Sequence, residues 1–511
     1  MPAVDKKEMW NTPRAISPRT GGLFCCLIAL SLLATTNVFA STLVRGFTPR
    51  FSVTTRGDLL VIGNTVMTCP GTSAICAPAQ NGVSVAAANN NNNAHDMVWI
   101  NTDAVTTSPE NSSRATLTIP GGSTVLFAGL YWGADTSAGT NGSAAPTPAN
   151  RNQVRFATPA SGFAITTAAQ VDISGSRYSG FADVTARVQA GGGGLYRVSG
   201  VQAGRGQDRY AGWTLVVIVA NASLPPRNMV VFDGYATINS TAPTSITTTV
   251  SGFRTPPAGA VNSRVGFIGY EGDLGSTGDN FRLNTTNLTD ALNPSGNVFN
   301  STVTSQGTRF ANKEPDYVNQ LGYDADFLTA NGVLANNATS ADITFTTGGE
   351  TYFPAAILFS TVVFEPVLAT NLVKSVTDVN GGSVAPGDVL EYTVAYGNTG
   401  NDGATNVVLT DVVPANTTYV PNSLNIVAGP NAGAKTDAAD GDQANLDLPN
   451  NRVVFRLGTG ADGINGGVLS PGVNGSVRFR VQVAATAAEG TVIPNTAQQA
   501  FRSQSLDEAL T

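Results

Sequence analysis

Short apolar runs separated by turn residues dominate the chain between residues 41 and 366. The runs alternate with polar residues or are continuously apolar, and clusters of Gly, Pro, Asn and Asp bound them, a pattern typical of β-strands. Amphipathic helical periodicity is nearly absent. We therefore predict an all-β domain, a large β-sandwich or jelly-roll-like fold with long loops. The strands that we expect are residues 58–62, 123–132, 213–219, 229–232, 264–268 and 355–364.

A second region of alternating residues follows a linker-like segment near Pro366. We place the domain boundary between Phe364 and Asn371, and we take residues 369–511 as the second domain. Its clearest predicted strand is residues 390–396, in which every second side chain is apolar or aromatic and would face a core. The inward residues would be Leu390, Tyr392, Val394 and Tyr396.

Three polar side chains interrupt the apolar strand faces of this second domain. They are Lys374 beside Leu372 and Val376, Asp411 beside Val407, Leu409 and Val413, and Asn495 beside Ile493 and Ala497. Polar groups buried without partners are costly, so we expect the three to meet. Burial would lower the pKa of the lysine and raise the pKa of the aspartic acid. A neutral amine could then attack the carboxamide, release ammonia and leave an isopeptide bond.

A purely structural interpretation of the same residues stays open. Lys374 could extend its amine to solvent, Asp411 could cap the turn before Pro414, and Asn495 could bond a neighbouring loop. Perturbed buried groups also occur in structural clusters.

The motifs around these residues resemble a known family. An early Lys is followed by PGD-x-x-x-YTV-x-x-x-NTG, then TD-x-x-P, then a closing IPNTA. This order is similar to the repeat domain called domain of unknown function 11, and to the related fimbrial isopeptide-formation domain of bacterial surface proteins. The resemblance implies an immunoglobulin-like β-sandwich over about residues 369–511. It also implies a self-catalysed bond in which Lys374, Asp411 and Asn495 take part.

The first forty residues have the pattern of a signal peptide. Basic residues precede an apolar run at residues 23–34, and Val38-Phe39-Ala40 precedes Ser41. This order predicts export with cleavage after Ala40, whereas an uncleaved anchor is the alternative. No later stretch is long and apolar enough to span a bilayer, so we expect no transmembrane helix after cleavage and a secreted or cell-surface location.

Composition and charge agree with an exported β protein. Only 12% of residues are charged, while there are 55 Gly and 27 Pro residues, which favours strands and turns over helices. Removing residues 1–40 takes away four basic and two acidic side chains, so the net charge falls from −7 to about −9. Nucleic acid is therefore not an expected partner.

Two cysteines remain after the predicted leader is removed. Cys69 and Cys76 are spaced as CPGTSAIC, and in an exported chain this pair predicts a small disulfide loop. Zinc binding is the lesser alternative because a zinc site would need further nitrogen or sulfur ligands, and the chain has one histidine.

Two features with known chemical associations are interpreted as structural. His95 is the chain's single histidine, and because it lies beside an Asn run we expect it in an exposed loop rather than in a catalytic triad. Arg56-Gly57-Asp58 spells a tripeptide associated with integrin binding. It stands at the entrance of a predicted strand, so we interpret the match as chance.

Acidic, Gly-rich loops supply the candidate metal site of the first domain. Calcium prefers six to eight oxygen ligands, which such loops can provide. The candidate ligands are Glu271, Asp273, Asp279, Asp324 and Asp326. Their spacing matches no defined calcium loop, and solvated turn residues are the alternative. A second acidic loop of the same ambiguity carries Asp437, Asp440, Asp442 and Asp447.

Together these patterns predict an exported structural or adhesive surface protein. The second domain would act as a stalk, and loops of the first would contact a surface ligand, protein or glycan, or other envelope components. We expect no turnover of an external substrate and no cofactor other than calcium. Two other functions stay open: a secreted carbohydrate-active hydrolase that uses the acidic loops, and a purely architectural envelope component.

Overall fold

The computed structural model describes residues 40–83, 90–256, 259–505 and 509–510. The predicted signal peptide therefore lies outside the described residues, apart from Ala40. The regular secondary structure of the described chain is almost entirely β-strand, which confirms the predicted all-β class. Its helices are short: α1 (Cys76–Gln80), α2 (Thr185–Gly191) and the 3₁₀ turns Asn92–Ala94, Pro148–Asn152, Ala369–Asn371 and Leu448–Asn450. None of the helices in this part of the chain is long and apolar enough to cross a membrane.

The largest sheet is assembled around one long strand, β1 (Thr42–Thr65). Residues 42–56 of β1 pair with β12, whereas residues 57–65 pair with β11. The strand thus passes from one half-sheet to another. The first half, in order, is β18 (Thr308–Arg309), β17 (Val303–Ser305), β20 (Tyr323–Thr329), β14 (Ser263–Tyr270), β22 (Phe353–Val362) and β12 (Pro226–Thr237). The second half is β11 (Ala211–Ala220), β5 (Thr124–Asp135), β9 (Arg177–Asp183) and β8 (Gln170–Ser174).

Gly57 stands at the point where β1 changes partners. A Cβ atom at this position would lie 1.9 Å from the backbone oxygen of Val219 on β11, so only glycine lets the two strands approach. Its neighbours are paired within the fold, Arg56 with Glu365 and Asp58 with Arg264. The Arg-Gly-Asp tripeptide therefore lies within strand β1, where the strand changes partners, and not in a loop.

Two smaller sheets complete this N-terminal region, which we define as residues 40–364. One contains β19 (Lys313–Glu314), β4 (Ser112–Leu117), β10 (Gly194–Ser199), β6 (Gln153–Thr158) and β7 (Ser161–Thr167). The other contains β13 (Ser245–Ser251), β21 (Ser340–Thr346), β15 (Asn280–Leu283) and β16 (Thr286–Asn287). The strands β2 (Met67–Thr68) and β3 (Val98–Trp99) form a separate two-stranded sheet.

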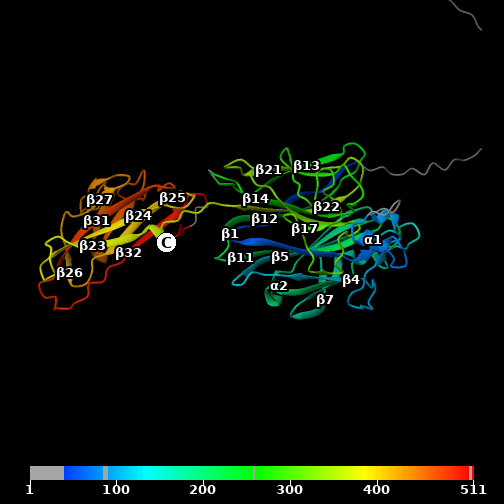
Figure 1. The fold of residues 1–511 in the computed structure, drawn as a ribbon, viewed down its shortest axis with the longest axis horizontal. Helices are drawn as coiled ribbons and strands as arrows, with labels where there is room; N and C mark the ends of the chain where they lie inside the picture. The colour runs from blue at the N-terminus through cyan, green and yellow to red at the C-terminus, as the bar shows by residue number, and fades with distance from the viewer. Residues whose placement is uncertain (1–39, 84–89, 257–258, 506–508, 511) are drawn as a thin grey trace, which may run out of the picture. The chain divides into compact units, whose positions relative to one another are not determined.

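The sheets stack as four layers with three hydrophobic cores between them, as the strand positions in Figure 1 illustrate. The middle core lies between the two half-sheets and includes Val216 of β11 and Val231 of β12. Val217 faces the five-stranded sheet, whereas Val230 faces the four-stranded sheet. Both faces of these central strands are buried, which explains why their sequences are continuously apolar.

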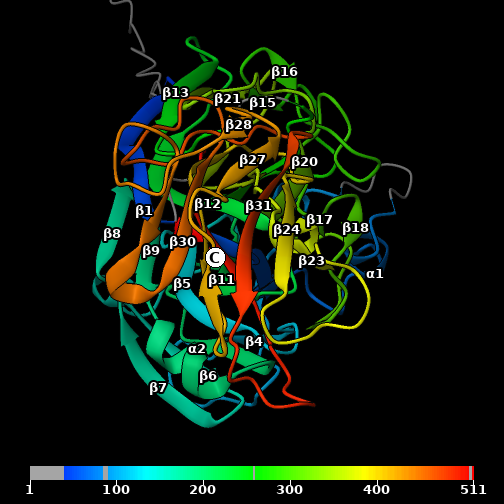
Figure 2. The same ribbon diagram turned by 90° about the vertical axis from the view of Figure 1, so that its left-hand side faces the viewer.

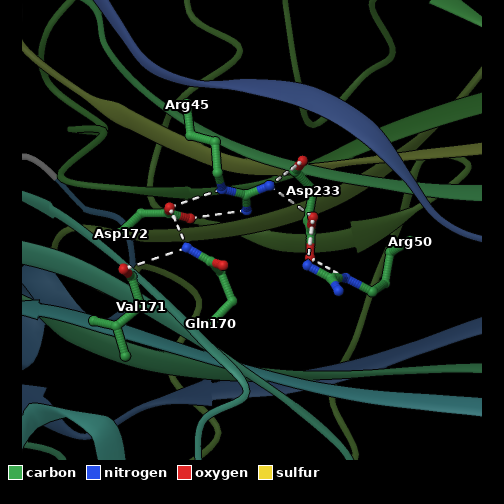
Figure 3. A network of polar contacts seen from close by, with 6 residues as sticks. All are labelled: Arg45, Arg50, Gln170, Val171, Asp172 and Asp233. Carbon is green, nitrogen blue, oxygen red and sulfur yellow. Dashed lines mark hydrogen bonds and ion pairs between the residues drawn. The ribbon is translucent and has the colours of Figure 1, made fainter.

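An ion-pair network ties the edge strand β8 to the centre of the large sheet (Figure 3). Arg45 on β1 donates two hydrogen bonds to Asp172 on β8, at 2.7 and 2.9 Å, and a third to the Asp233 carboxylate on β12. Arg50 binds the same Asp233 carboxylate through two nitrogens. Each carboxylate is therefore neutralised by an arginine, which offsets its burial.

The C-terminal region, residues 368–510, is an immunoglobulin-like sandwich of two sheets around one core. The first sheet has β23 (Val373–Asp378), β24 (Val389–Gly397), β31 (Asn474–Val483), β27 (Asn425–Ala428) and β28 (Gly433–Ala434), with β26 (Thr417–Tyr419) also paired to β31. Figure 2 shows β23, β24 and β31 in this order. The second sheet has β29 (Ala444–Asp447), β30 (Arg452–Leu457), β25 (Ala404–Val412), β32 (Ala497–Ser503) and β33 (Ala509–Leu510).

The prediction of which side chains point into the core is correct for the central strands of this sandwich and partly wrong for its outer strands. The inward residues expected on β24, and the apolar neighbours of Asp411 on β25, are buried. Val376 is 54% exposed, because β23 is an edge strand with a neighbour on only one side. The predicted closing strand begins only at Ala497, since Pro494 has no backbone N–H to join a ladder.

Candidate functional site

Lys374, Asp411 and Asn495 come together inside the C-terminal sandwich. Lys374 belongs to the edge strand β23 of one sheet, and Asp411 lies near the end of β25 in the other. Asn495 precedes β32, whose first residue, Ala497, pairs with Asp411. The sandwich therefore brings a residue of its first strand, and a residue just before β32, to one carboxyl group.

The lysine and the aspartic acid form a direct contact. Lys374 Nζ donates to Asp411 Oδ2, and the two side chains are 14% and 0% exposed. The ammonium lies 4.5 Å from the ring centroid of Tyr392 and 5.5 Å from that of Phe479. These two rings stack on one another, with centroids 5.4 Å apart. The amine therefore packs against aromatic rings and has little access to water.

Burial moves both groups of this pair toward their neutral forms. Desolvation lowers the pKa of Lys374, an effect that the Asp411 carboxylate partly opposes. Desolvation likewise raises the pKa of Asp411, opposed by Lys374 and by Asn495. A neutral amine beside a protonated carboxyl group is the state that can attack a carboxamide.

Asn495 is placed at the same carboxyl group. Its side chain interacts with Asp411 and with the hydroxyl of Tyr392. Its Nδ2 atom is buried and makes no well-formed hydrogen bond, and Asp411 Oδ1 also has no hydrogen-bond donor. The two atoms that the reaction would use, the leaving nitrogen and the second carboxyl oxygen, are thus not held by well-formed hydrogen bonds.

The predicted acidic residues of the N-terminal region also come together, but in the interior. Glu271 follows β14, Asp279 precedes β15, and Asp324 and Asp326 lie on β20. Glu350, in the turn between β21 and β22, joins them: Asp273 N–H donates to its Oε2 atom, and its carboxyl group contacts Asp279. The acidic cluster, as we define it, consists of Glu271, Asp273, Asp279, Asp324, Asp326 and Glu350, each at most 7% exposed.

Five of the six carboxyl groups in this cluster accept a hydrogen bond at one oxygen, the exception being Glu271. Five of the six also have a buried oxygen without a hydrogen-bond donor. Asp279 Oδ2 accepts the N–H groups of Val298 and Phe299 at 2.7 and 2.6 Å, and Asp324 Oδ1 accepts the N–H of Thr302 at 3.0 Å. The oxygens without a hydrogen-bond donor are Glu271 Oε2, Asp279 Oδ1, Asp324 Oδ2, Asp326 Oδ2 and Glu350 Oε1.

Burial raises the pKa of these groups strongly. Desolvation and the charges of Asp279 and Asp273 raise the pKa of Glu350 to about 11, and desolvation raises the pKa of Asp273 to about 7. Desolvation also holds the pKa of Glu271, Asp324 and Asp326 well above the usual range. Keeping one such group protonated at pH 7 costs about 3–4 kcal/mol. Four groups would cost about as much as the whole stability of a typical domain, about 5–15 kcal/mol.

The other predicted sites have clear outcomes. Cys69 and Cys76 form a disulfide, as expected from their spacing. The prediction for His95 is wrong: it is only 3% exposed, because the Asn run packs onto the acidic cluster rather than into solvent. In the second acidic loop, Asp437, Asp440 and Asp442 are loop residues, whereas Asp447 ends strand β29. These carboxylates accept hydrogen bonds from nearby groups, as in Asp437 with Tyr419, Asp440 with Thr436, Asp442 with Ala444 and Asp447 with Arg452.

The arrangement of the acidic cluster also bears on the two chemistries considered for it. Its members are each at most 7% exposed, so they lie in the interior rather than on the surface. Among the residues that the structure describes, no three His, Cys, Asp or Glu side chains already surround one point as metal ligands. Sequence patterns missed Glu350, whose Gly348-Gly349-Glu350 turn carries no distinctive signal, and Asn92, hidden in a polar run.

Comparison with known families gives a match over most of the C-terminal region. Residues 373–505 match a family described as a domain of unknown function (DUF7619). This match contains Lys374, Asp411 and Asn495. No curated protein matches the chain.

Two solved structures align with this chain at low similarity. Native α2-macroglobulin from Escherichia coli, from domain MG7 to the C-terminus, has 10% identity and a TM-score of 0.16 over 35% of this chain and 29% of that chain. A Corynebacterium diphtheriae protein described as membrane anchored has 9% identity and a TM-score of 0.16, over 91% of this chain and 89% of that one. The present chain thus spans less than a third of the macroglobulin fragment, and at these TM-scores neither alignment supports an argument.

Proposed function

We propose that this chain is an exported structural or adhesive protein of the bacterial cell surface, with a C-terminal sandwich that an internal bond locks against tension. The observation that carries the proposal is the contact of Lys374 Nζ with the buried Asp411 carboxyl group, to which Asn495 is also adjacent. The predicted signal peptide, the low charge content and the disulfide support an extracellular location.

The chemistry of the bond follows from the positions of the three groups. Lys374 loses its proton and attacks Cγ of Asn495, while protonated Asp411 donates a hydrogen bond to the carboxamide oxygen. In the tetrahedral intermediate, a proton moves from the lysine nitrogen to Nδ2. The bond between Cγ and Nδ2 then breaks, and Nδ2 leaves as ammonia. The products are one secondary amide and one ammonia, so no oxidant or cofactor is needed.

The mechanical consequence comes from which strands are linked. Lys374 lies on the first strand of the sandwich and Asn495 just before β32. A bond between them would carry a pulling force directly from one end of the region to the other. The chain between the two residues could not extend, and the core would stay folded under load.

Single-molecule stretching of the full chain tests this function. We expect the wild-type C-terminal region to resist extension, whereas a Lys374→Ala variant should unfold and lengthen by the chain enclosed between residues 374 and 495. Lys435→Ala, which changes the only other lysine of the region, should behave as the wild type. Equal lengthening of wild type and Lys374→Ala would refute the proposal.

A further inference from the structure

The centre of the acidic cluster has no counter-charge from the protein. Asp279 and Glu350 contact one another, and the charges of Asp273 and Asp324 also act on this pair. In the described part of the chain, no Lys or Arg forms an ion pair with any of these four carboxylates. This differs from Asp172 and Asp233, which are equally buried and which the fold pairs with arginines. Asp402 is also buried without an ion pair, but it stands alone and accepts hydrogen bonds from Ser503 and Ser505. Several carboxyl groups buried side by side without a cation are far more costly, and this points to an outside cation.

A neutral side chain next to the cluster gives an independent indication of a ligand. Asn92 is 0% exposed, and both its Oδ1 and Nδ2 atoms have no hydrogen-bond partner. Its backbone N–H donates to Asp273 Oδ1 at 3.1 Å, which holds it at the cluster. A wholly buried carboxamide without a partner is rare in folded proteins, and its oxygen is a good ligand for a hard cation.

The backbone leaves room for oxygen atoms at the same place. A Cβ atom on Gly272 would lie 2.5 Å from Asp324 Oδ2 and 2.5 Å from the backbone oxygen of Phe299. Gly272 therefore lets a carboxylate and a carbonyl oxygen approach the loop between Glu271 and Asp273. Carboxylate, carbonyl and carboxamide oxygens are the donor set that calcium prefers.

We propose that a calcium ion binds within the acidic cluster, held by the carboxylates of Asp279, Glu350 and Asp324. These residues come from three segments distant in sequence, and the Asn run reaches the cluster through Asp273. Fewer than three of the carboxylates already converge on one point, so the side chains close around the ion when it binds. The remaining ligands are backbone, carboxamide or water oxygens. The ion would fasten the loops at this end of the N-terminal region to its core.

Calorimetric titration of the metal-free full chain with CaCl₂, paired with thermal unfolding in CaCl₂ and in EDTA, tests the site. We expect one binding event per chain and a higher unfolding temperature of the N-terminal region in calcium. Glu350→Gln should weaken binding at least tenfold and abolish the calcium-dependent shift. Glu110→Gln, which removes an exposed glutamate of the same region, should retain both.

A proton shared between Asp279 and Glu350 is the competing explanation, and it predicts the opposite result. A glutamine would then replace a protonated glutamic acid, so Glu350→Gln should raise the unfolding temperature at pH 7, and calcium should have no effect on the wild type. If Glu350→Gln does not fold, the wild-type titration still decides. Absence of calcium binding with equal unfolding temperatures in CaCl₂ and EDTA would overturn the proposal.

Discussion

Lys374 and Asp411 face each other across the C-terminal sandwich, with the lysine amine between the Asp411 carboxyl group and the ring of Tyr392. The lysine belongs to one sheet and the aspartic acid to the other, so their contact crosses the core. The pair needs a third partner, because Asp411 Oδ1 has no donor. Asn495 lies at that carboxyl group, and from this relationship the crosslinking proposal follows.

Asp411 should be required for the crosslink although it is not one of the linked residues. In an Asp411→Ala variant, Asn495 loses the acid that would polarise its carboxamide, so we expect Lys374 and Asn495 to remain unlinked. Peptide mapping by mass spectrometry measures this directly. Asp447→Asn, a change at the end of strand β29, which β30 separates from the strand of Asp411, serves as the control and should crosslink fully. A linked peptide pair from Asp411→Ala would show that the carboxyl group plays no part.

Replacing one partner of the buried Lys374–Asp411 pair should lower the free energy of unfolding more than replacing both partners. In an Asn495→Ala background, which cannot crosslink, Lys374→Met leaves Asp411 buried without a cation and should lower the free energy of unfolding by about 3 kcal/mol. Adding Asp411→Leu should recover most of this loss, because two apolar side chains then fill the same space. Urea unfolding of the three variants measures the difference. Additive losses from the two substitutions would contradict a coupled pair.

Gly57 should be irreplaceable where β1 moves from β12 to β11. Gly57→Ala would place a methyl group against the backbone oxygen of Val219, and the strands would have to separate. We expect a loss of about 2–4 kcal/mol in the free energy of unfolding. Gly46→Ala on the same strand has no atom within 4 Å of the added carbon and should be nearly neutral. Equal unfolding temperatures for the two variants would contradict this account of the crossing.

The N-terminal region without calcium should be more stable in acid than at neutral pH. A carboxyl group whose pKa is raised on folding, such as Glu350 at about 11, binds more protons in the folded state than in the unfolded state. Stability therefore falls as pH rises above the unfolded pKa of about 4.3. Asp273, Asp279 and Asp324 act in the same direction. We expect a higher unfolding temperature in EDTA at pH 5 than at pH 8, and calcium should reduce the difference. An unfolding temperature that rises from pH 5 to pH 8 in EDTA would contradict this prediction.

The sequence predicts strands well where both neighbours and both faces are buried. The runs around Val216 and Val231 are continuously apolar because each strand separates two cores. The pairing of Lys374 with Asp411 was also predictable, since both stand on apolar strand faces. Contacts between residues distant in sequence were not predictable. The change of partner at Gly57 depends on the position of Val219 on β11. Glu350 reaches the acidic cluster only because of the turn before β22. The exposure of Val376 depends on β23 being an edge, which periodicity does not reveal.

The intact mass of the purified full chain, beside that of Lys374→Ala, tests the central claim most directly. The account predicts that the wild type is lighter than its sequence by one ammonia, after correction for the disulfide and for any removed leader. Tryptic peptides containing Lys374 and Asn495 should then run as one species, and the variant should have its unmodified mass. An unmodified wild-type mass with the two peptides separate would contradict the account and leave a structural Lys-Asp-Asn cluster in an immunoglobulin-like sandwich.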